Sequence, residues 1–234
     1  MRTLFFYIYF HVTLISFGFA QGEFSYEHAY RENILLDQEI VTGGYYVDPA
    51  KNIEGHPYFR DRNFENGKIK INDLLYEEVP LLYDIWKDEI LTFQPIYKKK
   101  ILVRADKVQE FIIGDKDAKK FVRIAENPGY SFHRNGLYEL ISEGKVSLLA
   151  KHYKQTKDTR DVSKFSDVFY EKTDYFLKKG DELQLIRKKK QAREFLDMEK
   201  KAFKNVFKSQ RISFKDQREA YLLKLVSGYN SREQ

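Results

Sequence analysis

Histidine has the widest chemical repertoire of the side chains in this sequence, because its imidazole can ligate a metal ion or transfer a proton near neutral pH. There are five, at His11, His28, His56, His133 and His152. No two of them stand two or four residues apart, the spacings that place two metal ligands on one face of a strand or helix. The spacing therefore predicts no metal site. A site assembled from distant histidines is the alternative.

The most distinctive local motif is the run Gly55-His56-Pro57-Tyr58-Phe59. Glycine and proline favour a tight turn, which would place the histidine at its tip beside two aromatic rings. A histidine in such a place can act as a general base or contact a ligand. Alternatively, the motif is a structural turn whose rings pack on a sheet. His56 and Tyr58 are therefore candidate binding residues.

Acidic residues surround the single tryptophan, with Asp84, Asp88 and Glu89 close to Trp86. Two carboxyl groups roughly 5–9 Å apart across a cleft are the arrangement that glycoside hydrolysis needs. An aromatic ring beside acids at a sheet edge is also an arrangement that can bind a sugar. The same residues are equally typical of a turn between two strands. Trp86 and Asp88 are candidate binding residues on this pattern.

Several classes of chemistry are excluded by composition. The chain has no cysteine, so it has no thiolate nucleophile, thiolate zinc site or iron–sulfur cluster. The Gly-x-Ser-x-Gly motif and the glycine-rich phosphate-binding loops are also missing. The sequence therefore assigns no catalytic residue and predicts neither a cofactor nor a metal.

The first twenty residues are typical of a secretory signal peptide. Arg2 is their only charge, an apolar stretch follows from Leu4 to Phe17, and the small residues Gly18 and Ala20 end the segment. We expect cleavage after Ala20, and an uncleaved membrane anchor is the alternative. The next residue is Gln21, so the protein is not expected to be a lipoprotein. The pattern predicts export to the periplasm or the extracellular space, with no transmembrane segment after cleavage.

The overall charge is mildly basic. The chain has 41 Lys and Arg against 35 Asp and Glu, and because the acids are interspersed we expect no nucleic-acid partner. Two short basic clusters stand out, Lys98–Lys100 and Arg187–Lys190. They are typical of a solvated turn and of the outer face of a helix start. The alternative is a patch for phosphate or an anionic lipid surface.

Alternating apolar residues separated by polar turns predict an antiparallel meander. The aromatic content of 16% also favours a sheet, where rings pair across strands. The predicted strands lie at 39–47, 67–71, 74–79, 81–86, 89–93, 100–103, 108–113, 121–124, 136–142 and 146–151. Residues 154–164 are charged and predict an exposed loop. A last hairpin is expected over 175–186, with its turn at 178–181.

After residue 186 the apolar period becomes helical. Phe195, Leu196, Ala202, Phe203, Val206 and Phe207 form one stripe, and Tyr221, Leu222, Leu225, Val226 and Tyr229 form another. Ser213 is placed to cap the second helix, and Gly228 to end it. The fold class is α+β and mainly β, an antiparallel meander forming a curved sheet or open barrel, followed by a hairpin and two or three C-terminal helices. The expected parts are 1–20 (signal peptide), 21–36 (leader), 37–152 (β domain) and 153–234 (loop, hairpin and helices, packed on the β domain).

Several stretches together carry a family resemblance. They are the segments 40–46, 55–59, 67–69, 79–84, 136–140 and 144–151, followed by the aromatic hairpin and the helices. The chain resembles a broad group of uncharacterised exported proteins of Bacteroidota over nearly its whole mature region. The resemblance implies export and a sheet-then-helix order, and it implies no activity for any residue.

These observations lead to three functional hypotheses. The first is an exported, non-catalytic envelope or secreted protein that binds a partner, either a protein or a glycan. The second is a hydrolase with a carboxylate or histidine site in the cleft between sheet and helices. The third is a carrier of an apolar small molecule, which requires the sheet to close around a cavity. The sequence leaves the oligomeric state open.

Overall fold

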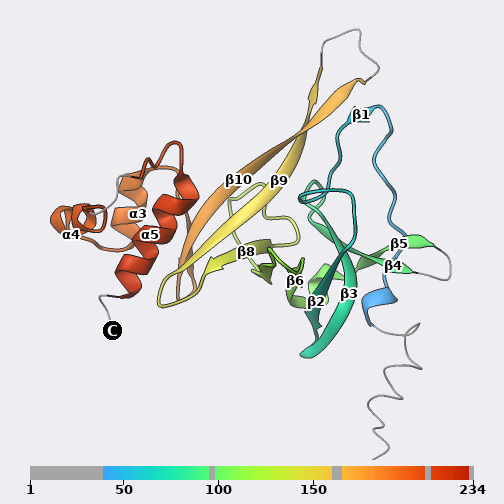
Figure 1. The fold of residues 1–234 in the computed structure, drawn as a ribbon, viewed down its shortest axis with the longest axis horizontal. Helices are drawn as coiled ribbons and strands as arrows, with labels where there is room; N and C mark the ends of the chain where they lie inside the picture. Colours follow the sequence, from blue (N-terminus) through green and yellow to red (C-terminus); the bar gives the residue numbers. More distant parts are fainter. Residues whose placement is uncertain (1–38, 95–97, 160–164, 209–211, 232–234) are drawn as a thin grey trace, which may run out of the picture. The chain divides into compact units, whose positions relative to one another are not determined.

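A computed structural model describes residues 39–94, 98–159, 165–208 and 212–231 (Figure 1). The predicted signal peptide (1–20) and leader segment (21–36) lie outside the described residues. All described residues fall within one unit, Glu39–Gln234.

Within these ranges, eleven strands form a single sheet with the order β1-β10-β9-β8-β7-β6-β2-β3-β4-β5, and β11 pairs with β10. The strands are β1 (Ile53–Glu54), β2 (Glu65–Ile71), β3 (Leu74–Asp84), β4 (Glu89–Gln94), β5 (Lys99–Val103), β6 (Val108–Ile113), β7 (Lys119–Arg123), β8 (Leu137–Ser142), β9 (Ser147–Asp158), β10 (Asp167–Lys179) and β11 (Glu182–Leu185). Two antiparallel meanders, β2 to β5 and β6 to β11, are joined by the pair β2–β6. The path begins at β1 and ends at β5, so the sheet is curved and open, which confirms the predicted fold class.

Among the strand pairs of the described residues, only β1 and β10 run parallel, with Ile53 opposite Asp167. The region predicted as extended at 39–47 begins instead with a 3-10 turn, η1 (Glu39–Val41). It then runs beside β5, where the Tyr46 amide donates to the Lys100 carbonyl at 3.0 Å. A second 3-10 turn, η2 (Ala105–Lys107), connects β5 to β6.

Strand β3 is longer than the sequence predicts. The pattern indicates two short strands separated at Pro80, but one strand continues through the proline. Pairing with β4 begins only at Leu81, so Pro80 lies just beyond that ladder, and a separate register shift between Gly67 and Ile69 of β2 leaves Glu78 with a positive φ of 54°. A strand tolerates a residue without an amide hydrogen where the neighbouring ladder has ended, and the bulge at Glu78 absorbs an extra residue of β3.

The prediction of an exposed loop over 154–164 is wrong for its first five residues. β9 continues to Asp158, and residues 147–158 pair continuously with residues 167–178 of β10 (Figure 1). The polar side chains do not prevent this pairing, because they find partners within the sheet. Lys154 donates to the Tyr58 carbonyl at 2.7 Å, and Tyr170 donates to Gln155 across the hairpin at 3.0 Å. The sheet therefore extends past residue 152.

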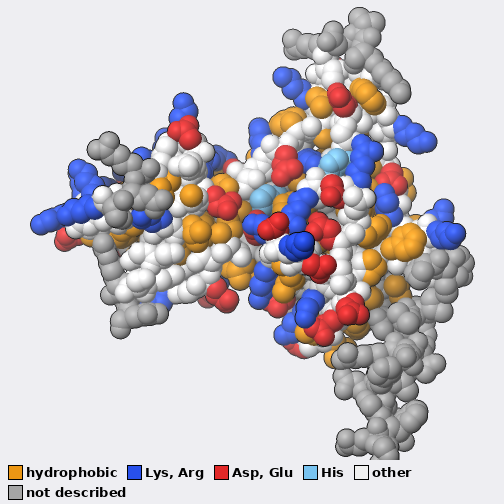
Figure 2. All heavy atoms as spheres, viewed as in Figure 1, with side chains coloured by type: hydrophobic (Ala, Val, Ile, Leu, Met, Phe, Trp, Pro, Cys, Tyr) orange, Lys and Arg blue, Asp and Glu red, His pale blue; other side chains and the backbone are white. Residues whose placement is uncertain are grey.

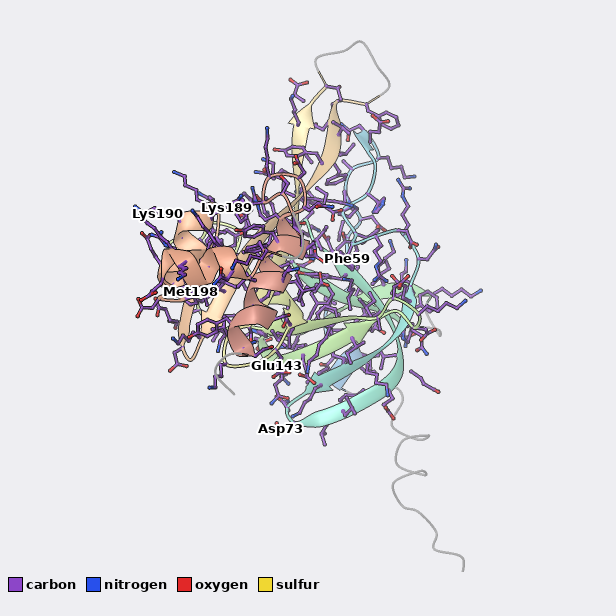
Figure 3. All side chains as sticks on the ribbon, turned by 60° about the vertical axis from the view of Figure 1, so that its left-hand side comes forward. Phe59, Asp73, Glu143, Lys189, Lys190 and Met198 are labelled. Carbon is purple, nitrogen blue, oxygen red and sulfur yellow. The ribbon has the colours of Figure 1, made fainter. Side chains whose placement is uncertain are left out.

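Aromatic rings fill the concave side of the meander. Phe111 stacks on Phe121 with ring centroids 4.7 Å apart, and Phe59 meets Phe121 edge-on at 5.3 Å. Tyr83 contacts the same ring at 5.1 Å. Figure 3 shows Phe59 beside the strands and Asp73 at the tip of the β2–β3 hairpin. The space enclosed by the curved sheet is therefore occupied by packed side chains.

Among the described residues, three helices pack where β9 begins and β10 ends: α3 (Lys189–Phe195), α4 (Lys200–Asn205) and α5 (Arg218–Asn230). Their apolar side chains form one cluster with Val146, Leu148 and Leu177 of the β8–β9 turn and strands β9 and β10. The predicted inner face of the last helix is confirmed, since Tyr221, Leu222, Leu225, Val226 and Tyr229 are all buried.

Two predicted helix signals act differently from expectation. Ser213 accepts a hydrogen bond from the Asp216 amide at 3.4 Å, but α5 begins only at Arg218. Gly228 lies inside α5 and does not end it. A Cβ atom at Gly228 would stand 3.1 Å from Val206, so this glycine allows the segment after α4 to approach α5 closely.

Candidate functional site

The Gly-His-Pro-Tyr-Phe motif lies directly beside the turn that carries the tryptophan. The Phe59 amide donates to the Tyr83 carbonyl at 2.8 Å, and the Ile85 amide donates to the Pro57 carbonyl at 3.0 Å. These two bonds pair residues 57–59 with residues 83–85 in antiparallel fashion. The structure thereby brings the predicted candidates His56, Tyr58 and Trp86 together.

Strands β9 and β10 complete the same surface. The Lys154 amide donates to the Ile85 carbonyl at 3.2 Å, and its ammonium lies 3.6 Å from the Glu171 carboxylate. The Phe169 ring meets the Trp86 ring edge-on, with centroids 5.4 Å apart. We call this surface the aromatic junction, and it consists of His56, Tyr58, Trp86, Lys87, Lys154, Phe169 and Glu171.

The aromatic rings of Trp86 and Phe169 in the junction are partly exposed to solvent. Glu171 is exposed, while His56, Trp86, Lys87 and Phe169 are each partly exposed. Tyr58 is only 3% exposed and lies behind them. The Lys87 ammonium stands 5.8 Å from the centre of the Trp86 ring, within the range of a cation–π contact. A partly exposed ring bordered by charges of both signs is a surface that can hold a polar ligand with an apolar face.

A buried carboxylate fixes the backbone that carries Trp86. One oxygen of Asp84 accepts hydrogen bonds from the amides of Trp86 (2.8 Å) and Lys87 (2.9 Å). The other oxygen accepts from the Tyr46 hydroxyl at 2.6 Å. Burial raises the pKa of Asp84, although the hydrogen bonds from Tyr46 and from the two amides oppose that rise. The turn is therefore held by a carboxylate with no exposed surface.

A second polar group anchors Tyr58. Its hydroxyl donates to Asp48 at 2.6 Å, and the Lys100 ammonium lies 2.6 Å from the same carboxylate and 2.7 Å from the hydroxyl. The Lys100 ammonium also stands 4.9 Å from the Tyr58 ring centre. Because Tyr58 is tied at both its ring and its hydroxyl, it gives His56 a fixed platform, with the two rings stacked at 6.0 Å.

His56 is the one junction residue with an uncommitted polar atom that is already buried. Its Nδ1 has no hydrogen-bond partner in the described part of the chain. Burial lowers the pKa of His56, and the positive charges of Lys154 and Arg62 lower it further. The imidazole is therefore neutral at neutral pH, and it can donate or accept a hydrogen bond.

Asp88 does not belong to the junction. Its carboxylate is 1% exposed and lies 2.6 Å from the equally buried Lys151 ammonium. Tyr83 donates to the same carboxylate, and the Lys151 ammonium also donates to the Leu137 carbonyl at 2.9 Å. Burial lowers the pKa of Lys151 to about 8, opposed by the charge of Asp88. The pair ties the β3–β4 turn to strands β8 and β9, which is a structural role.

Sequence reasoning missed a polar array that crosses four adjacent strands. The Lys119 ammonium on β7 lies 2.6 Å from Glu139 on β8, and His152 Nε2 on β9 lies 2.6 Å from the same carboxylate. His152 Nδ1 in turn lies 3.1 Å from the Thr173 hydroxyl on β10. Burial would raise the pKa of Glu139, but the hydrogen bonds from His152 and Lys119 hold it below its ordinary value. Only the strand register, which the sequence does not give, brings these residues together.

The histidines are not assembled into a metal site. His133 Nδ1 lies 2.9 Å from the Tyr138 hydroxyl, while His152 is engaged by Glu139 and Thr173. Among residues 39–94, 98–159, 165–208 and 212–231, no group of three or more His, Asp or Glu side chains is arranged to hold a metal ion. His11 and His28 lie outside these ranges.

Buried tyrosines that donate to carboxylates predict a loss of stability in alkali. Burial raises the pKa of Tyr46 and Tyr83, and the neighbouring Asp84 and Asp88 raise it further. In the unfolded chain a tyrosine ionises near pH 10. Because the folded pKa is higher, this stabilisation is complete below about pH 10 and is lost as the pH rises further. The lowered pKa values of the buried Lys151 and Lys154 act in the opposite sense, but only up to the ordinary lysine pKa of about 10.4.

We therefore expect the denaturation midpoint to fall steadily above about pH 10. The tyrosinate absorbance should rise in two phases, with the buried hydroxyls ionising only as the chain unfolds. Tyr46→Phe should make the alkaline fall shallower, whereas Tyr45→Phe, at a side chain that is 59% exposed, should leave it unchanged. A single tyrosinate phase that is complete before unfolding would contradict this assignment.

Comparisons with known proteins identify no relative of this chain. Within the described residues, no helix has both the length and the apolar character needed to cross a membrane. No family model, no curated protein and no solved structure matches the chain.

Proposed function

We propose that the protein is an exported, non-catalytic module of the cell envelope or the secreted fraction, and that its aromatic junction binds a glycan. The observation that carries the proposal is the partly exposed Trp86 ring, fixed by Phe169 and by the Asp84 turn and surrounded by Lys87, Lys154 and Glu171. Export rests on the signal-peptide pattern of residues 1–20 and on the resemblance to exported proteins of Bacteroidota.

A sugar ring suits the aromatic junction because it has an apolar face and polar edges, which match the aromatic and the charged side chains of the junction. The C–H groups of a pyranose are apolar and pack on an aromatic face, while its hydroxyls need donors and acceptors at the edge. Glu171 offers an acceptor, Lys87 offers donors, and the neutral His56 offers either. A protein partner would need a larger continuous surface, of about 800 Å² on each side.

Catalysis at the junction gains no support from its carboxylates. Asp84 is fully buried, and both of its oxygens accept hydrogen bonds from the protein. Asp48 is held by Tyr58 and Lys100. The remaining acid, Glu171, is the only carboxylate among the seven junction residues, so the junction does not supply the paired arrangement that hydrolysis of a glycosidic bond needs.

A hydrolase remains the second candidate because of the Thr173–His152–Glu139 array, in which a hydroxyl, an imidazole and a carboxylate are bonded in sequence. This order is the one found in enzymes that activate a hydroxyl nucleophile. Here, however, the array lies across neighbouring strands, and the Lys119 ammonium compensates the charge of Glu139. It serves equally to hold β7, β8, β9 and β10 in register.

The test is titration of the protein with a panel of neutral and acidic oligosaccharides, followed by calorimetry on those that bind. We expect at least one to bind saturably, and Trp86→Ala to weaken its binding by about tenfold or more, since removing a stacked ring costs on the order of 1 kcal/mol beyond the lost contact area. Phe93→Ala is the matched control, because Phe93 is an exposed ring (37%) on β4 outside the junction.

Four results would count against the proposal. No saturable oligosaccharide, or equal binding by the Trp86→Ala variant, would remove the junction as a glycan site. Capture of one defined envelope protein that is lost in Trp86→Ala would make the ligand a protein. Shortening of the bound oligosaccharide during incubation would favour the hydrolase.

A further inference from the structure

The positive charge of this protein is concentrated in one short stretch of the chain. From Arg187 to Lys208 there are nine Lys or Arg and three Asp or Glu, a net charge of +6. The whole chain also carries +6, so the residues outside this stretch are balanced, with 32 charges of each sign. The excess therefore resides on α3, α4 and the segments that flank them.

Most of these basic side chains point into solvent. Lys188–Lys190, Lys200, Lys201, Lys204 and Lys208 are all exposed. Figure 2 shows Lys and Arg side chains projecting from the helical layer, and Figure 3 shows Lys189 and Lys190 on α3 near Met198. We call this surface, formed by the basic side chains of residues 187–208, the basic helical face.

Local acids neutralise little of this surface. Glu194 lies 3.6 Å from Lys190 and 3.7 Å from Arg193, in pairs whose side chains are mostly or partly exposed. Pairs of this kind contribute little and are screened by salt. Asp197 and Glu199, both exposed, are the other two acids of the stretch. They leave the lysines of α4 with a clear excess of positive charge.

Packing beneath the helices keeps the lysines on the outside. Phe207 stacks on Tyr221 with ring centroids 4.1 Å apart, and Phe203 lies 6.0 Å from Phe207. Ala192 and Leu196 of the α3 segment are buried against the sheet. Because the apolar side chains of α3 and α4 are committed to this cluster, the two helices present their cations as a fixed group. Phe203 and Phe207 remain partly exposed among them.

We propose that the basic helical face binds the surface of an anionic phospholipid bilayer. Each Lys or Arg held near such a surface contributes favourably and additively, and partly exposed apolar side chains among the cations strengthen the contact. A nucleic acid is the less suitable partner, because single strands stack on open aromatic faces, and the partly exposed Phe207 already lies face to face with Tyr221. The inference is independent of the aromatic junction, which lies at Trp86 and not on the helices.

The experiment measures co-sedimentation of the full chain with vesicles of phosphatidylcholine, with and without about 30% phosphatidylglycerol. The apolar start of the chain is common to every sample, so the readout is the ratio of binding to the two vesicle types. We expect a preference of about tenfold or more for the anionic vesicles, lost in the triple variant Lys200→Glu, Lys201→Glu, Lys204→Glu. Salt at about 0.5 M should also abolish the preference.

The matched control is the triple variant Lys51→Glu, Lys116→Glu, Lys157→Glu, which reverses three exposed lysines elsewhere and changes the net charge equally. It should keep most of the preference. Equal loss in both variants would mean that net charge alone acts, and equal binding of the wild-type chain to both vesicle types would overturn the proposal. Binding to duplex DNA or to a polyglutamate peptide without binding to anionic vesicles would also overturn it. Unchanged circular dichroism of both variants shows that they fold.

Discussion

Replacing Lys151 by methionine should lower the free energy of unfolding by about 3–5 kcal/mol, the usual cost of removing one partner from a buried ion pair. The Asp88 carboxylate would remain in the interior with its charge uncompensated, because both residues are 1% exposed. The Leu137 carbonyl would also lose its bond from the ammonium. Methionine fills much of the vacated volume. The loss of stability therefore measures the uncompensated charge of Asp88 more than the creation of a cavity.

Urea denaturation provides the measurement, and Lys157→Met is the matched control because Lys157 lies on the same strand and is exposed. The control should change stability by less than about 0.5 kcal/mol. The double variant Lys151→Met, Asp88→Asn should recover more than half of the loss, since it leaves no buried charge. Asparagine also tolerates the left-handed backbone at Asp88, where φ is 65°. If Lys151→Met cost no more than Lys157→Met, the pair would not stabilise the fold.

The local elements of the fold can be predicted from the sequence because their signals are short-range. The turn pair Asn72-Asp73 has positive φ at both residues (49° and 67°), as a tight hairpin turn requires. The strand predicted at 108–113 has the same ends in the structure, Val108 and Ile113. The buried stripe of α5 follows from helical spacing alone. In each case the residue types within one turn or one period determine the local structure.

Contacts between distant residues cannot be predicted in this way. The charged run after residue 153 indicates a loop when it is considered alone, and it becomes a strand because Lys154 reaches the Tyr58 carbonyl, 96 positions away. A proline usually interrupts a strand, yet β3 continues through Pro80 because the ladder to β4 begins only at Leu81 and requires no amide hydrogen from the proline. In both cases tertiary partners outside the local window override the local preference.

The candidate site shows the same division. Residue type identifies His56, Tyr58 and Trp86, but their proximity depends on the pairing of residues 57–59 with residues 83–85. Asp88 is grouped with Trp86 because the two are close in the sequence. In the structure the Asp88 side chain turns inward to Lys151, 63 positions away. Sequence proximity therefore identifies the turn, and the strand register decides which of its side chains face solvent.

Replacing Gly136 by alanine is the second substitution for which a large effect is expected. Gly136 has φ of +76°, and a Cβ atom there would stand 2.1 Å from the Ile124 carbonyl oxygen. The Ile124 backbone is held close to Gly136, because the Ile124 amide donates to the Gly136 carbonyl at 2.8 Å. The left-handed backbone alone costs alanine about 1 kcal/mol, and the displaced backbone adds to it. We expect a total loss of about 3 kcal/mol or more.

Gly129→Ala separates these two contributions. Gly129 has a similar φ of +82°, in the same β7–β8 connection, but a Cβ atom there would meet nothing within 4 Å. It should therefore lose only the conformational share, about 1 kcal/mol. Denaturation of both variants side by side gives the difference, which measures the close approach of Gly136 to Ile124. Equal losses would show that the turn moves freely to admit a methyl group, and that Asn135, which donates to the Asp88 carbonyl at 2.8 Å, does not hold it in place.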